Sequence, residues 1–309
     1  MRIVVAGSGG TGGYFGAKLA RSGEDVTFLA RGAHLEAIQN RGLTIRSAVE
    51  GEWHVRPLAV DSLTGQPTAD LVLFCVKSFD TESVADLVRP VVGPDTVVLS
   101  IQNGVDNEEK IGGILGPDHV LGGTAYVFSN IESPGVIAHH QFGRIILGET
   151  KGGLSERGER IAAACRGAGI ETEADPDIHG TLWRKYVFLV ALSGTTAITR
   201  LPVKFIRDLP ETHELWRRQI EEMLALALAE NAGLGEDMMA SCTSLLESLA
   251  PTNYSSLYQD LAAGKRMELD ALHGHATRLG THHGVPTPTL FAVYAALVPY
   301  LNGRPDTAG

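Results

Sequence analysis

The N-terminal segment contains the feature that most restricts the fold of this chain. A β-branched run from Ile3 to Val5 leads into a glycine-rich loop, and a helix-like stretch follows from Tyr14 to Arg21. Strand, GxGxxG and helix in this order form the dinucleotide fingerprint of a βαβ unit. The residues predicted to surround a pyrophosphate at the helix N-terminus are Gly7, Ser8, Gly9, Gly10, Thr11 and Gly12. A glycine-rich turn without a ligand is the alternative.

The residue after the second expected strand bears on which dinucleotide binds. This strand is predicted at residues 25 to 30, and Arg31 follows it. NAD sites usually place a carboxylate here for the ribose 2′-hydroxyl, whereas a guanidinium can bind a 2′-phosphate. Arg31 therefore favours NADP over NAD, unless it is only a solvated loop residue.

Polar residues end two further apolar runs. The run at 69–78 contains Lys77 near its end, and the run at 96–104 contains Asn103. Ligands bind beyond the carboxyl ends of the strands in such sheets, so both side chains are expected near the nucleotide. The segment 135–149 is predicted to form a hairpin or two short strands.

Helical periodicity dominates the second half of the chain. Helices are predicted at 155–168, 182–199, 211–232, 236–249, 254–281 and 287–301. The predicted fold class is α/β, with a Rossmann-type doubly wound sheet over 1–177 and a C-terminal all-α domain over 178–309.

Composition restricts the possible partners. With 309 residues, 44% of them hydrophobic and a net charge of −10, the chain is expected to form two globular domains that do not bind nucleic acid. No run is apolar enough to span a membrane, and the N-terminus lacks a signal-peptide pattern, so we expect a cytoplasmic protein without membrane contact. No metal site is expected, because the three cysteines Cys75, Cys165 and Cys242 are far apart. The histidines do not suggest one either. His139 and His140 would point to opposite faces of a strand, and the pair at 282–283 lies in an expected loop.

The helix expected at 182–199 carries a lysine on an otherwise apolar segment. Lys185, Leu189 and Ser193 are four residues apart and share one face. If this face lines the ligand cleft, the ammonium can orient a carbonyl and donate a proton as hydride adds to carbon. A surface lysine that reaches into solvent is the alternative.

Several motifs together resemble the ketopantoate reductase (2-dehydropantoate 2-reductase) family. They are the glycine loop, "VKSFDT" at 76–81, "QNGVDNEE" at 102–109, "WRKY" at 183–186, "SSLYQDLAAGKRMELDALHG" at 255–274 and "GVPTPT" at 284–289. The match covers nearly the whole chain in order, and the block at 255–274 is the most specific. The resemblance implies NADPH-dependent reduction of ketopantoate to pantoate in pantothenate biosynthesis, and a homodimer formed through the helical domain.

The resemblance also implies roles for single residues. Arg31 matches the family's 2′-phosphate arginine, Lys77 and Phe128 match cofactor contacts, and Asn103 matches an asparagine that touches cofactor and substrate. Lys185 matches the proton-donating lysine, and Glu268 matches a glutamate near both that lysine and the cofactor. The implied substrate-binding residues are Asn103, Lys185, Ser193, Asn253, Ser255 and Ser256, with Ser256 the best match for the family's substrate-binding serine.

One departure leaves the substrate open. Family members that make pantoate carry asparagines one and two turns after the lysine, where this chain has Leu189 and Ser193. A bulkier or less hydroxylated 2-oxo acid is therefore an alternative substrate, because leucine offers apolar surface in place of a hydrogen bond. A related dehydrogenase working toward oxidation and a catalytically silent NADP-binding protein also stay open.

Overall fold

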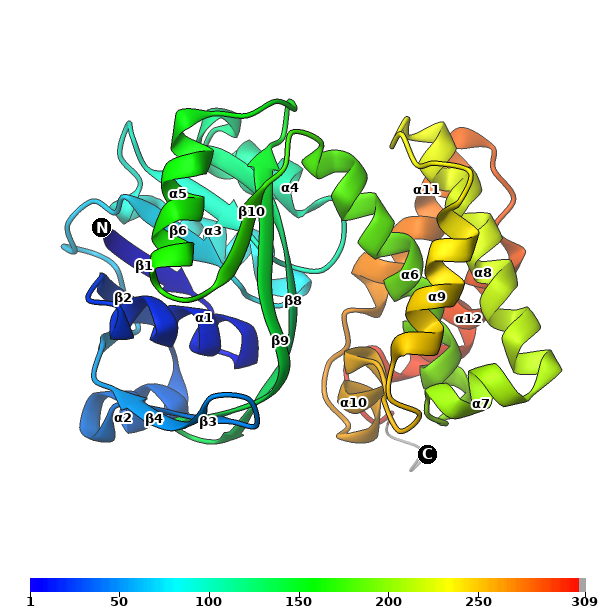
Figure 1. Cartoon of the computed structure of the whole chain (residues 1–309), viewed down its shortest axis with the longest axis horizontal. Helices are drawn as coiled ribbons and strands as arrows, with labels where there is room; N and C mark the ends of the chain where they lie inside the picture. The colour runs from blue at the N-terminus through cyan, green and yellow to red at the C-terminus, as the bar shows by residue number, and fades with distance from the viewer. Residues whose placement is uncertain (306–309) are drawn as a thin grey trace. The chain divides into compact units, whose positions relative to one another are not determined.

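The computed structural model describes residues 1–305 and divides the chain into two compact units, Met1–His179 and Gly180–Gly309 (Figure 1). The division falls within helix α6 (Ile178–Thr199). The first unit is a mixed sheet with helices, and the second is helical, so the predicted fold class is confirmed. The roles assigned to the two domains stay predictions.

The first unit is built on one ten-stranded sheet with the order β4-β3-β9-β8-β7-β6-β1-β2-β5, while β10 pairs with β9. Its strands are β1 (Arg2–Ala6), β2 (Asp25–Leu29), β3 (Leu43–Ser47), β4 (Gly51–Val55), β5 (Leu58–Val60), β6 (Leu71–Phe74), β7 (Val97–Ser100), β8 (Val120–Ser133), β9 (Val136–Glu149) and β10 (Glu171–Ala174). Its helices are α1 (Gly10–Arg21), α2 (Gly32–Arg41), α3 (Thr81–Val88), α4 (Asn107–Leu115) and α5 (Glu156–Gly167).

The parallel part of this sheet reverses its order at β1. Strand β2 pairs with one edge of β1, and β6 pairs with the other, both in parallel. Such a reversal creates a switch point at the carboxyl ends of the two central strands, where ligands bind in α/β sheets. The loop after β1 and the loop after β6 therefore meet at the predicted nucleotide site.

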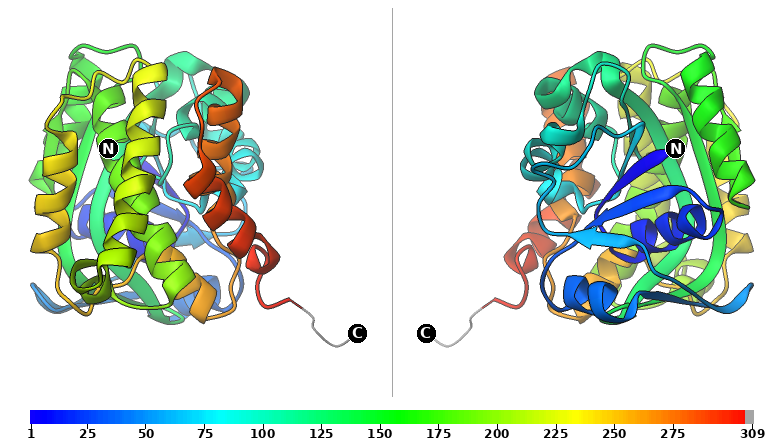
Figure 2. Two further views of the ribbon diagram at one scale, coloured as in Figure 1. Left: turned by 90° about the vertical axis from the view of Figure 1, so that its right-hand side faces the viewer. Right: turned by 90° about the vertical axis from the view of Figure 1, so that its left-hand side faces the viewer.

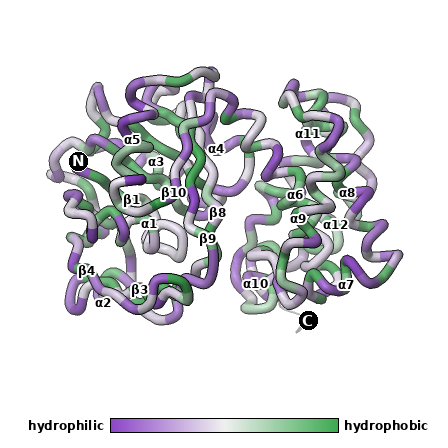
Figure 3. The backbone as a smooth tube through the Cα atoms, in the orientation of Figure 1, coloured by the Kyte–Doolittle hydropathy of each residue, from purple (hydrophilic) through white to green (hydrophobic). Residues whose placement is uncertain are grey.

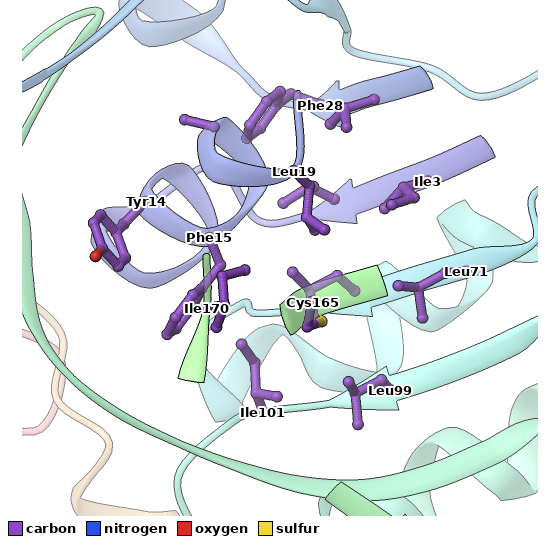
Figure 4. Close-up of a cluster of buried hydrophobic side chains, with 14 of the residues drawn as sticks. Ile3, Tyr14, Phe15, Leu19, Phe28, Leu71, Leu99, Ile101, Cys165 and Ile170 are labelled. Carbon is purple, nitrogen blue, oxygen red and sulfur yellow. The ribbon is translucent and has the colours of Figure 1, made fainter. Parts of the chain in front are cut away.

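Alternating strand residues cover the two faces of the sheet. Ile3, Leu71 and Leu99 pack with Phe15 of α1 and Cys165 of α5 in one buried cluster (Figure 4). Their sequence neighbours form a second cluster with α3 and α4 on the opposite face; these include Val4, Val72, Val98, Ala85, Val88 and Ile111. Burial on both faces explains the continuous apolar strands. Hydrophobic residues accordingly colour the inner strands in Figure 3, and hydrophilic residues colour much of the rim.

The segment 135–149 differs from its prediction. It is neither a hairpin nor two short strands, because almost all of it forms one long strand, β9, whose antiparallel partner is β8. Register shifts interrupt this pair at three places, including Tyr126/Val127. Such irregularities bend strands, which obscured the alternation in the sequence. Strand β10 also follows α5, in a region where only helices were predicted.

The second unit consists of helices that pack side by side (Figure 2, left). After α6 they are α7 (Val203–Asp208), α8 (Pro210–Ala229), α9 (Met238–Ser248), α10 (Ser256–Ala262), the π-helical turn η4 (Asp270–Gly274), α11 (His275–His283) and α12 (Pro288–Leu297). The single helix predicted at 254–281 is wrong. The chain leaves α10 through Gly264, whose φ of +64° ends the helix, and re-forms helix only after Met267.

The two histidine pairs and the three cysteines differ in their surroundings. His139 is buried and bonds to Ser47, whereas its neighbour His140 is exposed and bonds to Asn130. The pair at 282–283 ends α11 instead of lying in a loop. All three cysteines are free, and burial raises the pKa of each thiol, to about 11 for Cys165.

Residues 1–305 contain neither a candidate membrane span nor a candidate metal cluster. Among these residues, no helix is both long and apolar enough to cross a bilayer. Nor does that part of the chain hold a group of three or more His, Cys, Asp or Glu side chains placed for a metal ion.

Candidate active site

The glycine loop between β1 and α1 is shaped by close backbone approaches. Gly7 has φ of +104°, and a Cβ at this position would lie 2.8 Å from the backbone nitrogen of Val76, just after β6. A Cβ at Gly12 would lie 2.0 Å from the carbonyl oxygen of Gly7. Both contacts are too short for any side chain, so the fold itself requires these two glycines.

Gly9 differs, because the protein does not require a glycine there. It caps α1 with φ of −68° and ψ of −166°, which suit any residue, and a Cβ would meet no atom within 4 Å. The space beside Gly9 lies at the start of α1, where the first backbone N–H groups have no partners within the helix. Open space, free donors and the positive end of the helix fit a pyrophosphate, so the residues present suit a dinucleotide.

Arg31 lies directly after β2 and caps α2. Its side chain is 88% exposed, and Nη2 lies 3.2 Å from a carboxylate oxygen of Asp80. An exposed ion pair of this kind contributes about 0–1 kcal/mol, so a phosphate can readily replace Asp80. The arginine is therefore available to a ligand at the end of β2.

Lys77 and Asn103 occupy the loops after β6 and β7, which are neighbouring strands. Gln102 joins these loops, because its Nε2 donates to the carbonyl oxygen of Val76 at 3.0 Å and to Oγ1 of Thr81 at 2.8 Å. Sequence reasoning missed Gln102, although it directly precedes Asn103 and is buried. The geometry thus brings both predicted residues to the carboxyl edge that also carries the glycine loop.

Phe128 lies on β8 and is partly buried. Its ring packs at a tilt against Phe142 of β9, with 5.8 Å between the centroids. One of the register shifts between the two strands separates Phe128 from Ser129. Phe128 therefore lies at an irregularity of the strand pair.

Lys185 and Glu268 come together in the second unit. Lys185 is partly exposed on α6, and Glu268, only 6% exposed, lies two residues before η4. Removal from water lowers the pKa of Lys185 to about 8, and the negative charge of Glu268 opposes this change. A lysine with such a pKa is largely protonated at neutral pH and can still release its proton readily.

The structure separates the predicted substrate-binding serines. The hydroxyl of Ser255 caps α10 by accepting from the N–H of Tyr258 at 3.1 Å, and it also bonds to Oγ1 of Thr196 at 2.7 Å. Ser256 begins α10 and is partly exposed, as is Asn253. Ser256 is therefore better placed than Ser255 to bind a ligand.

The face of α6 that carries Lys185 becomes less exposed along the helix. Leu189, one turn on, is partly exposed, whereas Ser193, two turns on, is fully buried. The hydroxyl oxygen of Ser193 has no hydrogen-bond partner. Apolar surface thus follows the lysine directly, and Ser193 lies beneath it in the helical core.

A glycine loop at a switch point and, in a helical unit, a half-buried lysine paired with a buried glutamate define a dinucleotide-binding oxidoreductase with an appended helical domain. Models of "Ketopantoate reductase PanE/ApbA" and of its C-terminal part match residues 3–152 and 177–300. The chain belongs to the ketopantoate reductase family.

Individual relatives agree over nearly the full length. The 2-dehydropantoate 2-reductase of Pyrococcus horikoshii is 30% identical, with 96% of each chain covered. A PanE/ApbA family ketopantoate reductase from Ralstonia eutropha is 32% identical with a TM-score of 0.89, covering 97% of this chain and 98% of the other. A D-mandelate dehydrogenase solved with NADH and anilino(oxo)acetate has a TM-score of 0.90 over 97% of this chain and 98% of its own, but its 22% identity shows only a common fold.

Proposed function

We propose that this protein is an NADPH-dependent reductase of a 2-oxo acid, with 2-dehydropantoate the first candidate substrate and pantoate the product. The observation that carries the proposal is the pairing of Lys185 with Glu268 in a member of this family. A homodimer and a cytoplasmic location remain predictions.

In the proposed reaction, the glycine loop, Arg31 and Lys77 would hold NADPH, which when bound would supply the hydride that adds to the ketone carbon. Lys185 donates a proton from Nζ to the ketone oxygen, so that a 2-hydroxy acid and NADP⁺ result. Before transfer, the ammonium polarises the carbonyl, and during transfer it stabilises the developing oxyanion. The negative charge of Glu268 raises the pKa of the lysine and so favours its protonated form. Ser256 and Asn103 are proposed to bind the substrate, and Asn103 and Glu268 also to contact the cofactor.

The test is the oxidation of NADPH with 2-dehydropantoate and a panel of 2-oxo acids, compared as kcat/KM. We expect 2-dehydropantoate or a more apolar 2-oxo acid to be reduced, and NADPH to be used in preference to NADH. Binding of NADPH without turnover across the panel would instead support a catalytically silent NADP-binding protein.

Replacing Arg31 by alanine should weaken NADPH binding roughly 10- to 50-fold and leave NADH binding unchanged. The guanidinium is proposed to form a charge-assisted contact to the 2′-phosphate, which NADH lacks. Titration of both cofactors by fluorescence measures the effect. Arg89→Ala is the matched control, because Arg89 forms a similar exposed ion pair with Asp86. Equal weakening of both cofactors by Arg31→Ala would argue against the 2′-phosphate contact.

Leu189 favours a second class of substrate, the more apolar 2-oxo acids, because it places apolar surface one turn from Lys185. Replacing Leu189 by asparagine should raise kcat/KM for 2-dehydropantoate roughly tenfold relative to apolar 2-oxo acids, because an amide restores a partner for its hydroxyl. Leu189→Ala, which removes apolar surface without adding an amide, is the control. If both variants change the ratio alike, the amide has no specific role.

A further inference from the structure

Tyr186, the residue after Lys185, connects α6 to the turn that follows Glu268. It is buried, and its hydroxyl donates to the carbonyl oxygen of Leu272 at 2.6 Å and contacts that of Ala271 at 3.3 Å. Both carbonyls belong to η4. Tyr186, which directly follows the predicted proton donor, is therefore hydrogen-bonded to the backbone of η4, the turn that begins two residues after Glu268.

The turn that receives this bond has π-helical geometry. The N–H of His275 donates to the carbonyl of Asp270, five residues back, and the N–H of Leu272 donates to the carbonyl of Glu268 at 3.1 Å. Short π-helical segments are uncommon and occur frequently at functional sites. Because Glu268 is hydrogen-bonded into the start of this turn, movement of the turn would move its carboxylate.

A second connection returns from the turn to α6 through α8. Nε2 of His273 lies 3.2 Å from Oε1 of Gln219, whose Nε2 donates to Oγ1 of Thr195 at 2.9 Å. Burial lowers the pKa of His273 to about 3, so the ring is neutral and carries its proton on Nε2 for this bond. The turn is thus held to α6 by Tyr186, which directly follows Lys185, and also by the chain of bonds through Gln219.

We propose that Tyr186 is a positioning residue whose hydroxyl fixes the π-helical turn against α6 and thereby sets the separation between Glu268 and Lys185. The proposal rests on the proposed function for its catalytic consequence, but its structural content does not depend on the substrate. Tyr186 is buried and its hydroxyl donates to the turn, so it does not itself act on the reacting atoms.

The charges around Lys185 give this role a measurable consequence. Burial lowers the lysine pKa, and Glu268 raises it. The ring of Tyr186 also packs against His275 of α11, with 6.4 Å between the centroids. Loosening the turn would weaken the attraction between Glu268 and Lys185, so the pKa of the lysine should fall further.

The experiment compares Tyr186→Phe with Tyr294→Phe. Tyr294 is the matched control, because its hydroxyl donates to the side chain of Asp270 in the same turn and not to a backbone carbonyl among the described residues. Lysines are dimethylated with ¹³C and titrated by NMR, with Lys185→Arg used to assign the signal. In Tyr186→Phe we expect the pKa of Lys185 to fall by roughly 0.5 to 1, and kcat to fall about tenfold with KM for the 2-oxo acid within about twofold.

Each outcome decides the proposal. The proposal is overturned if the pKa of Lys185 in Tyr186→Phe is unchanged and equal to that in Tyr294→Phe. A loss of thermal stability without a change in this pKa also overturns it. If Tyr186→Phe does not fold, Gln219→Leu removes the second connection and should shift the titration in the same direction; no shift there also overturns the proposal. Failure of the wild type to reduce any 2-oxo acid refutes the proposed function, while the NMR titration still decides the role of Tyr186.

Discussion

Replacing Lys185 by alanine is expected to lower kcat for 2-oxo acid reduction by about 100- to 10,000-fold, the usual contribution of a positioned general acid. NADPH binding should change little, because the variant leaves the glycine loop and Arg31 intact. For the wild type, kcat/KM should fall as pH rises through about 8, since the protonated lysine is the donor and its pKa is lowered to that value. The variant should lose this dependence.

Steady-state kinetics across pH measure both effects. Lys204→Ala is the control, because Lys204 is an exposed lysine of the same unit that pairs with Asp208 and should leave kcat unaffected. A turnover number within a few-fold of wild type, with a raised KM, would show that Lys185 binds the substrate and does not supply the proton.

Two substitutions in the glycine loop should separate stability from binding. Gly12→Ala should lower the stability of the first unit, whereas Gly9→Ala should weaken NADPH binding and leave stability nearly unchanged. Gly12→Ala places a Cβ 2.0 Å from the carbonyl oxygen of Gly7. We expect this clash to destabilise the first unit by about 3 kcal/mol and to lower its melting temperature by roughly 5–10 °C. Gly9→Ala meets no protein atom, so its melting temperature should stay within about 2 °C of wild type.

Gly9→Ala should nevertheless raise the Kd for NADPH at least about tenfold, because the methyl group fills space that fits the pyrophosphate. Calorimetry and cofactor titration on both variants separate the two roles of glycine. Unchanged NADPH binding by Gly9→Ala would mean that the pyrophosphate lies elsewhere.

The first unit was predictable where the signals are local. The strand, glycine loop and helix at the N-terminus form as expected, because the turn, the close approach and the helix start are all encoded within about fifteen residues. The long strand β9 was not predictable, because its pairing with β8 is interrupted by register shifts that depend on the partner strand. Periodicity within one segment does not report such irregularities.

In the second unit, the missed break after α10 had a visible signal. Gly264 ends the helix with positive φ, and glycine is the commonest residue at such positions. The prediction ran through it because apolar residues continue at helical spacing on both sides. The later turn at 270–274 had no comparable signal, and its hydrogen bonds with Tyr186 and Gln219 join residues that are far apart in the sequence.

The sequence by itself determined the family, the order of the two units and the identity of the candidate site residues, because these depend on short motifs and their spacing. Only the tertiary structure decided which of those residues are available. It brought Glu268, which is 83 positions further along the chain, to Lys185, assigned the hydroxyl of Ser255 to a helix cap, and buried Ser193. The physical reason is that burial and hydrogen bonding are properties of neighbours in space, and these neighbours are distant in the chain.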